Sequence, residues 1–316
     1  MPEIFIVESD ICSFDADVVV LKHAQDFYGA DAVVAGALTN VTKQKQLTPK
    51  PGKHSLIPTN FQLAASYVLF VGVAPLYQFS YAQIREFSKR AIQITAKELP
   101  RASHIAMTVH GVGYGLDERE SFLAQLGGIL DAVNDQGAIK RVSIVEMNAM
   151  RARRLRTILR ETFQRDVDGL PATRKTEATQ RIDAGIESES KKHVFVAMPF
   201  AKEYEDTYVF GIQSPIHAIG LLCERVDMVV FTGDILERVK TRIDTAALIV
   251  ADLTGDNANV YLEVGYAWGR GRPTLLIARS SDDLKFDVRG QRCIIYENIV
   301  DLSKRLSNDL KTLATA

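Results

Sequence analysis

The sequence has few cysteines and histidines, and this limits the chemistry that it can support. Cys12, Cys223 and Cys293 are the three cysteines among 316 residues, and they lie far apart. This spacing is typical neither of a zinc site nor of a disulfide framework, and it favours buried thiols in a reducing compartment. The six histidines also lack ligand spacing. We therefore expect no bound metal and no prosthetic group.

Long apolar runs are also missing. No stretch approaches the roughly 18 residues that a membrane-spanning helix needs. The N-terminal residues MPEIFIVESD lack the basic region and apolar run of a signal peptide. These two absences predict a soluble cytoplasmic protein with no membrane partner.

The chain carries almost no net charge. Its 38 Lys and Arg residues balance 39 Asp and Glu residues, which leaves a formal charge of −1. There is thus no strong electrostatic signal for nucleic acid. Six arginines do gather in residues 151–165. A phosphate-binding face is one interpretation of them, and a solvated helix with its apolar side packed inward is the favoured one.

The length indicates more than one domain, because domains commonly hold roughly 100–200 residues. Residues 166–192 are polar and have few large apolar side chains, which is typical of a linker. We therefore predict an N-terminal domain over residues 1–165 and a C-terminal domain over residues 193–316.

Both halves alternate strand-like and helix-like segments, which predicts α/β folds. The first half gives strands at 4–7, 17–22, 67–73, 104–111 and 142–147, and helices at 30–41, 81–99, 121–134 and 150–165. The second half gives strands at 193–200, 227–231, 246–255, 273–279 and 292–297, and helices at 211–225, 235–245, 257–271 and 302–313. An open, doubly wound parallel sheet is the expected architecture of the second half, with its ligand at the carboxyl ends of the strands.

One stretch of the second half, ADLTGDNANVYLEVGYAWGRGRP (251–273), carries the clearest chemical signal. Asp252 falls at the end of a predicted central strand, and Asn257 or Asn259 can cap the following helix. Glu263 lies in an apolar, aromatic part of that helix, near its positive end, where an ionised carboxylate is favoured. An unpaired buried carboxylate is costly, so Glu263 is expected to face a cleft.

Purely structural roles are the alternatives for these two acids. Glu263 can pair with Arg270 or Arg272, and Asp252 can be a turn or cap residue. The chemical interpretation is cleavage of an N-glycosidic bond, where a carboxylate stabilises or attacks the oxocarbenium-like sugar. Nicotinamide leaves NAD as a neutral molecule and needs no general acid, whereas a purine or pyrimidine needs a proton. Asp252 or the region of Asp227 and Asp234 can supply that proton.

Residues 193–316 resemble the nucleoside 2-deoxyribosyltransferase family and its TIR-like relatives. The resemblance rests on VAMPF, on ADLTGDNANVYLEVGYAWGRGRPTLLI and on KFDVRGQRCIIY. It implies a flavodoxin-like fold with Glu263 as nucleophile. The other site residues that it implies are Asp252, Asn257 and Asn259 at the substrate, Met198, Pro199 and Phe200 along the pocket, and Asp287 and Arg289 in a nearby loop, where a structural ion pair is the alternative. HVFVAMPFAKEY is the form of TIR-like members, which favours NAD over base exchange.

The first half resembles, more weakly, the macro-like N-terminal domain of leucyl aminopeptidases and the macrodomain fold. The resemblance rests on VESDICSFDADVVVL, GADAVVAGALTN, VLFVGVAP and HGVGYGLDERESFLAQLGGIL. It implies an ADP-ribose-like ligand with Asp10 at the adenine and with Gly111, Gly113 and Gly115 as a phosphate loop beside His110. For His110 a role in the core or in the loop is the favoured interpretation. Leu21 stands where an asparagine is expected, and the peptidase metal ligands are absent. A protein-recognition or oligomerisation module is the alternative.

These observations lead to three hypotheses. The first is a homo-oligomeric NAD glycohydrolase that acts as a regulated anti-phage or stress effector, with a nucleotide-like or protein signal at the N-terminal domain. The second is a nucleoside or nucleotide 2-deoxyribosyltransferase, or a related N-glycoside hydrolase. The third is a non-catalytic nucleotide-binding signalling or scaffold protein.

Overall fold

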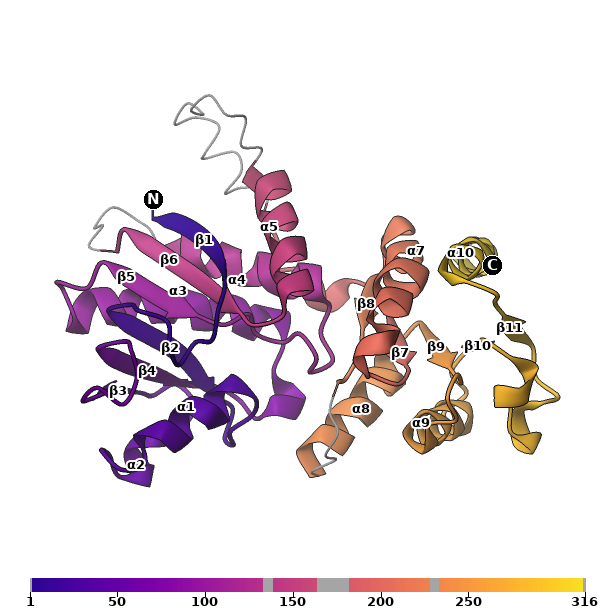
Figure 1. Cartoon of the computed structure of the whole chain (residues 1–316), viewed down its shortest axis with the longest axis horizontal. Coiled ribbons are helices and arrows are strands. Elements are labelled where there is room, and N and C mark those ends of the chain that lie inside the picture. Colours follow the sequence, from indigo (N-terminus) through magenta and orange to yellow (C-terminus); the bar gives the residue numbers. More distant parts are fainter. Residues whose placement is uncertain (1, 133–138, 164–181, 228–232, 315–316) are drawn as a thin grey trace. The chain divides into compact units, whose positions relative to one another are not determined.

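The computed structural model describes residues 2–132, 139–163, 182–227 and 233–314. The chain forms two compact α/β units (Figure 1). The first comprises Met1–Gly111 and Arg119–Glu189, and the second comprises Val112–Glu118 and Ser190–Ala316. Most of the predicted linker, up to residue 181, lies outside the described residues; a 3₁₀ turn, η2 (Ser188–Ser190), is near its end.

The first unit is built on a six-stranded mixed sheet with the strand order β1-β6-β5-β2-β4-β3. All pairs are parallel except β3 with β4. The strands are β1 (Glu3–Glu8), β2 (Val18–His23), β3 (His54–Pro58), β4 (Tyr67–Gly72), β5 (His104–Met107) and β6 (Arg141–Glu146). The helices are α1 (Ala30–Leu38), α2 (Gln44–Leu47), η1 (Leu76–Gln78), α3 (Tyr81–Glu98), α4 (Glu118–Ala132) and α5 (Ala149–Phe163).

Apolar patterning explains why these elements form. All six residues of β2 are buried, as is typical of a parallel strand covered on both faces. Helix α3 begins at Ser80, whose side chain accepts a hydrogen bond from the Gln83 amide, and it buries a stripe that includes Phe87 and Ala91. Helix α5 likewise buries Ala152, Leu155 and Ile158. Its arginines are exposed or half-buried, and Arg156 Nε donates to the Ile6 carbonyl of β1 at 3.2 Å.

The second unit contains a five-stranded parallel sheet in the order β11-β10-β9-β7-β8. Its strands are β7 (His193–Ala197), β8 (Leu222–Glu224), β9 (Leu248–Asp252), β10 (Thr274–Ala278) and β11 (Cys293–Ile295). Counted from β7, this is the 2-1-3-4-5 order of flavodoxin-like folds. The predicted fold class, α/β with a flavodoxin-like doubly wound sheet in the second half, is confirmed.

Helices cover both faces of this sheet. They are η3 (Lys202–Tyr204), the π-helix η4 (Thr207–Gln213), α7 (Ser214–Ala218), α8 (Gly233–Thr245), α9 (Ala258–Gly269), η5 (Ser281–Asp283), η6 (Phe286–Val288) and α10 (Ile299–Ala314). One core cluster joins alternate strand residues to η4, α7 and α10, and the other joins the intervening residues to α8 and α9. The alternation of side chains along each strand produces the two clusters.

The sequence prediction is wrong between residues 219 and 225. A helix was expected over 211–225, but α7 ends at Ala218 and the strand β8 (Leu222–Glu224) follows. Gly220 has a φ of 78°, a left-handed conformation that ends helices. The apolar residues that follow it can then enter the sheet. A strand was also expected over 227–231, and all of it except Asp227 lies outside the described part of the chain.

The segment Val112–Glu118 belongs to the second unit although it comes from the first half of the sequence. It lies beside the chain that leaves β8: the Gly115 amide donates to the Arg225 carbonyl at 3.0 Å, and the Asp227 amide donates to the Gly113 carbonyl at 2.8 Å. Asp117 is buried, and its Oδ2 accepts from the Cys223 amide at 2.8 Å and lies 2.6 Å from His217 Nε2. These bonds fix the segment to the second unit.

The Asp117→Ala substitution tests this anchor. It leaves the buried Cys223 amide and the His217 ring without their acceptor, so we expect it to lower the free energy of unfolding by about 2–4 kcal/mol. Urea unfolding followed by circular dichroism measures the change. The control is Glu237→Ala, which removes an exposed carboxylate paired with Lys240 and is expected to cost under ~0.5 kcal/mol. Equal effects of the two substitutions would show that Asp117 anchors nothing.

Candidate functional site

The switch point of the second sheet lies between β7 and β9. From β7 the chain adds β8 on one side and β9 on the other, and ligands of such sheets bind outside the carboxyl ends of the strands at this point. Met198, Pro199 and Phe200 follow β7 directly. Met198 and Pro199 are buried, and Met198 is part of the core, whereas Phe200 is half-buried. Phe200 is therefore the member of this trio best placed to meet a ligand.

Asp252 ends β9 and has no exposed surface. Its Oδ1 accepts from the Thr254 amide at 3.0 Å, and its Oδ2 accepts from the Tyr296 hydroxyl at 3.3 Å. Burial raises the pKa of this carboxyl group, while its hydrogen bonds oppose the rise. Asp252 thus shapes the turn after β9 and hydrogen-bonds Tyr296, as expected of a turn residue.

The turn after β9 is tightly packed. Gly255 has a φ of 77°, and a Cβ atom placed on it would lie 2.6 Å from the Tyr204 hydroxyl. A larger residue here would be strained at this φ and would have to displace the Tyr204 hydroxyl. Asn257 caps α9, and its side chain accepts from the Asn259 amide at 2.9 Å. Asn259 is half-buried and lies one helical turn before Glu263, so both side chains project from the same stripe of α9.

Glu263 is half-buried in α9 and has no hydrogen-bond or ion-pair partner among the residues that the structure describes. Arg270, one of its expected alternatives, pairs with Asp244 at 2.7 Å. Arg272, the other, has a buried Nε without a partner. Burial raises the pKa of Glu263 to about 8. An isolated, poorly hydrated carboxyl group therefore occupies the helix that starts at the carboxyl edge of β9.

This pKa corrects the expectation that Glu263 is ionised. Glu263 is the sixth residue of α9, beyond the first turn, where the stabilisation by the helix dipole is at most about 1 kcal/mol. Desolvation outweighs it because no cation compensates the charge. At neutral pH the side chain is mostly protonated. Among the described residues, Glu263 also has no contact with Asp252. The charge that acts on Asp252 is that of Arg279, which lowers the pKa of Asp252.

Arg279, Thr207 and Tyr296 gather at the same edge, and the sequence patterns did not single them out. Arg279 is the first residue after β10, and its amide donates to Thr254 Oγ1 at 3.1 Å. Its Nη2 donates to Thr207 Oγ1 at 3.3 Å, and its side chain also hydrogen-bonds Tyr296. The rule that ligands meet the carboxyl ends of parallel strands would have drawn attention to a cation placed there.

The remaining predicted residues of the second half lie in a loop. Asp287 and Arg289 are exposed, and Arg289 Nε donates to the Leu284 carbonyl at 3.0 Å. The expected ion pair between them is absent from the described interactions. Asp227 pairs with Arg225, and the side chain of Asp234 lies outside the described part. None of these residues has a contact with Glu263 among the described ones.

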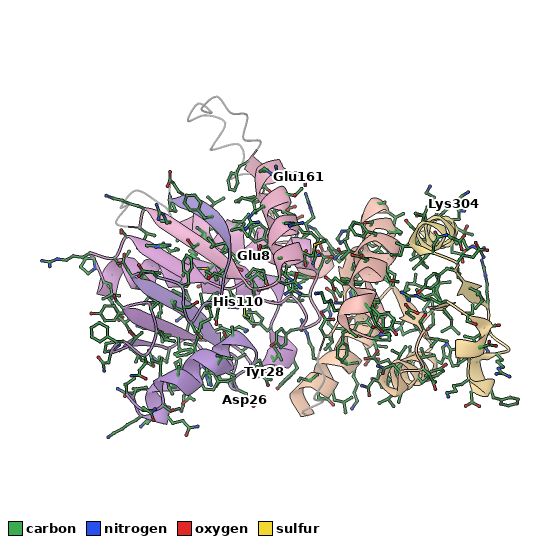
Figure 2. All side chains as sticks on the ribbon, viewed as in Figure 1. Glu8, Asp26, Tyr28, His110, Glu161 and Lys304 are labelled. Carbon is green, nitrogen blue, oxygen red and sulfur yellow. The ribbon has the colours of Figure 1, made fainter. Side chains whose placement is uncertain are left out.

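In the first unit, Asp10 follows β1 and accepts a hydrogen bond from the Cys12 amide at 2.9 Å. His110, labelled in Figure 2, follows β5 and is buried against the Phe87 ring at 4.5 Å between centroids. Its Nε2 has no hydrogen-bond partner among the described residues, and burial together with Lys22 holds the pKa of His110 well below its usual range. Its neutral ring is therefore a poor partner for a phosphate.

The predicted phosphate loop needs a correction. Gly111 belongs to the first unit, whereas Gly113 and Gly115 belong to the second. All three have the positive φ values that glycine allows. However, the Gly115 amide already donates to Arg225, so it is not available to a diphosphate. The five residues predicted for one ligand site thus fall into two units.

Among the described residues, no helix is long and apolar enough to cross a membrane. The same residues contain no group of three or more His, Cys, Asp or Glu side chains arranged to hold a metal ion. Cys12, Cys223 and Cys293 are free thiols.

Comparisons with known proteins give structural likeness only. No family model matches the chain, and no curated protein does. A variant of the Oceanobacillus iheyensis macrodomain, solved with ADPR, is similar over 51% of this chain and 93% of its own, with 18% identity and a TM-score of 0.40. The Trypanosoma brucei macrodomain in complex with ADP is similar over 49% of this chain and 67% of its own, with 15% identity and a TM-score of 0.41.

The raised pKa of Glu263 predicts a pH-dependent effect on stability. The folded state holds the proton up to about pH 8, whereas the unfolded chain releases it near its ordinary value of 4.5. The wild type therefore loses stability as the pH rises through this window. Glu263→Gln removes the loss, so we expect the variant to be more stable by about 2–4 kcal/mol at pH 8 and equal to wild type at pH 4.

Urea unfolding at both pH values measures this difference. Glu297→Gln, an exposed carboxyl of the same unit, is the control and is expected to stay within ~0.5 kcal/mol of wild type. If the stability of Glu263→Gln relative to wild type is the same at pH 8 as at pH 4, Glu263 is well hydrated or paired and its pKa is not raised.

Proposed function

We propose that the second unit cleaves the N-glycosidic bond of a nucleotide, with NAD as substrate and Glu263 as the catalytic carboxyl group. The observation that carries the proposal is an unpartnered, half-buried carboxyl group whose pKa is raised to about 8. Such a group costs stability, and acids of this kind are found at functional sites more often than elsewhere. Its helix begins at the sheet edge where ligands of this fold bind.

A cationic substrate suits this acid. The nicotinamide ring of NAD carries a positive charge, and an opposite charge within about 4–6 Å favours the carboxylate form. Binding of NAD would then ionise Glu263 beside the bond to be broken. The bond between C1′ and the ring nitrogen breaks, and its electron pair stays on nicotinamide, which leaves as a neutral molecule. The carboxylate stabilises or attacks C1′, and water completes hydrolysis to ADP-ribose with release of a proton.

Base exchange on a neutral deoxynucleoside is the second candidate function. The raised pKa of Glu263 favours it, because the side chain then carries a proton at neutral pH. A protonated Glu263 can give its proton to a leaving purine, as a general acid with a raised pKa does. The sugar would then need a second, accessible carboxylate. Asp252 is fully buried and bonded to Thr254 and Tyr296, so it is a poor candidate for that role. NAD hydrolysis needs a single carboxylate side chain and no general acid, and it is therefore the preferred reaction.

Regulation by the N-terminal unit extends this proposal. In an anti-phage or stress effector, a nucleotide-like or protein signal at the first unit would control cleavage by the second, and homo-oligomerisation could contribute. The segment Val112–Glu118 supports this idea, because it directly follows Gly111 of the first unit and is bonded into the second. A non-catalytic scaffold remains the contrasting hypothesis, and it predicts that changing Glu263 alters no reaction.

Release of nicotinamide from NAD tests the catalytic role. We expect wild-type protein to release it and Glu263→Gln to be slower by about 10²–10⁴-fold, since the variant keeps the shape but cannot ionise. Chromatography of the products measures both rates, and Glu297→Gln serves as the matched control with unchanged activity. Absence of release from NAD and of base release from deoxynucleosides and their monophosphates would overturn the proposal.

The pH profile separates the two reactions. For NAD hydrolysis, kcat/KM should rise through about pH 8, because the free enzyme must lose the Glu263 proton to give the carboxylate. For a neutral deoxynucleoside, kcat/KM should fall through the same pH, because the proton is needed by the leaving base. Initial rates at low substrate concentration between pH 6 and 10 measure the profile. A profile on NAD that falls toward high pH would contradict the carboxylate mechanism.

A further inference from the structure

Arg279 is an exposed cation at the edge of the sheet where the proposed substrate binds. In the register of β10 with β9, Ile277 pairs with Asp252, so Arg279 lies just beyond the carboxyl end of the central strand. No carboxylate lies within ion-pair distance of its guanidinium among the described residues. Five other arginines of this unit are paired with acids: Arg225, Arg242, Arg270, Arg292 and Arg305. The charge of Arg279 is thus not paired within the described part of the protein and is available to an anionic ligand.

Neutral groups hold Arg279 in place. Thr207 Oγ1 accepts from its Nη2 at 3.3 Å, and Tyr296 hydrogen-bonds its side chain. The guanidinium carbon lies 5.7 Å from the centre of the Tyr204 ring, at the distance of a cation–π contact. Asp252, the acid whose charge acts on Arg279, is buried and already accepts two hydrogen bonds. The guanidinium is therefore oriented without being neutralised by a paired acid.

The support for this arrangement is rigid and buried. Thr207 has no exposed surface, and it is the first residue of the π-helix η4. π-Helical turns are rare and occur often at functional sites. Tyr296 and Tyr204 are buried too, and the Gly255 turn packs against Tyr204. A guanidinium has five N–H donors, so donors remain free for two oxygens of one anion.

We propose that Arg279 binds a phosphate group of the substrate and makes the site select nucleotides over nucleosides. This inference rests on the proposed function. A planar guanidinium that is fixed, exposed and unpaired binds phosphate through two parallel charge-assisted hydrogen bonds. It lies at the carboxyl edge shared with the start of α9, so one ligand there can offer its phosphate to Arg279 while its sugar faces Glu263. The substrate class is then a nucleotide with a phosphate on the ribose.

Nicotinamide mononucleotide and nicotinamide riboside test this directly, because they share the bond to be cleaved and differ by one phosphate. For wild type we expect kcat/KM to be about 30–100-fold higher for the mononucleotide, the effect of one strong charged contact. Arg279→Leu should lower this ratio to below about 3, and Arg279→Lys should retain part of it. Arg270→Leu, which changes an arginine at the far end of α9, is the control and should keep the wild-type ratio.

Two results would overturn the inference. One is a wild-type ratio near 1. The other is an Arg279→Leu variant that loses the same factor on both substrates, since a purely structural role lowers both equally. Circular dichroism of the full chain shows whether the variant is folded, and Arg279→Lys, which keeps the charge, provides a second variant if it is not.

Binding to the Glu263→Gln protein separates this inference from the proposed function. Calorimetry with the same two compounds does not require cleavage. Tighter binding of the mononucleotide that is lost in Glu263→Gln/Arg279→Leu, without any cleavage by wild type, would support the role of Arg279 and reject the proposed reaction. Cleavage of both compounds at equal efficiency, with equal binding, would reject the role of Arg279 alone.

Discussion

The cost of taking a carboxyl group out of water organises the second unit. Asp117, Glu224 and Asp252 are all buried there, and each has partners that compensate its charge: the Cys223 amide, the Arg242 guanidinium and the Thr254 amide among them. Glu263 is the exception, because it is poorly hydrated and has no partner among the described residues. Hydrogen bonds or ion pairs compensate the charge of Asp117, Glu224 and Asp252, whereas the charge of an ionised Glu263 has no such compensation among the described residues. A positively charged substrate would supply it.

The topology of the sheet decides where the functional groups gather. Because all five strands are parallel, residues that follow β7, β9, β10 and β11 share one edge although they are distant in the sequence. This is how Tyr296, Arg279 and the Asp252 turn come to lie together. The π-helix adds Thr207 to the same group. The edge thus carries a cation with no paired acid among the described residues, and the helix that contains Glu263 begins at the same edge.

Much of the fold was predictable from local patterns, and the site only in part. Near-continuous apolar runs identified β4 and β9, and the spacing of Glu263 from Asp252 placed it in the helix after a central strand. β3, an edge strand that ends at Pro58, has no run of buried residues and was missed. β8 was missed, because the helix expected over its residues ends early at Gly220.

Contacts between residues that are distant in the sequence explain why the rest of the site was not predicted. The protonation of Glu263 depends on which cations approach it, and the pairing of Arg270 with Asp244 is not visible in sequence spacing. Arg279 becomes notable only when Thr207 and Tyr296 are brought to it by the fold. The Gly-rich segment has the glycines of a phosphate loop, yet its backbone pairs with residues that come more than a hundred positions later.

The place of Val112–Glu118 has a consequence for how such a protein can be taken apart. The second unit is discontinuous in the chain, since seven of its residues are encoded within the first half. A fragment that starts at His193 would lack the buried carboxylate that holds the Cys223 amide. The second unit therefore cannot be transferred complete to another protein as one continuous stretch of the chain. The two halves are expected to be inherited together, so any control of one by the other needs no separate mechanism to keep them in the same molecule.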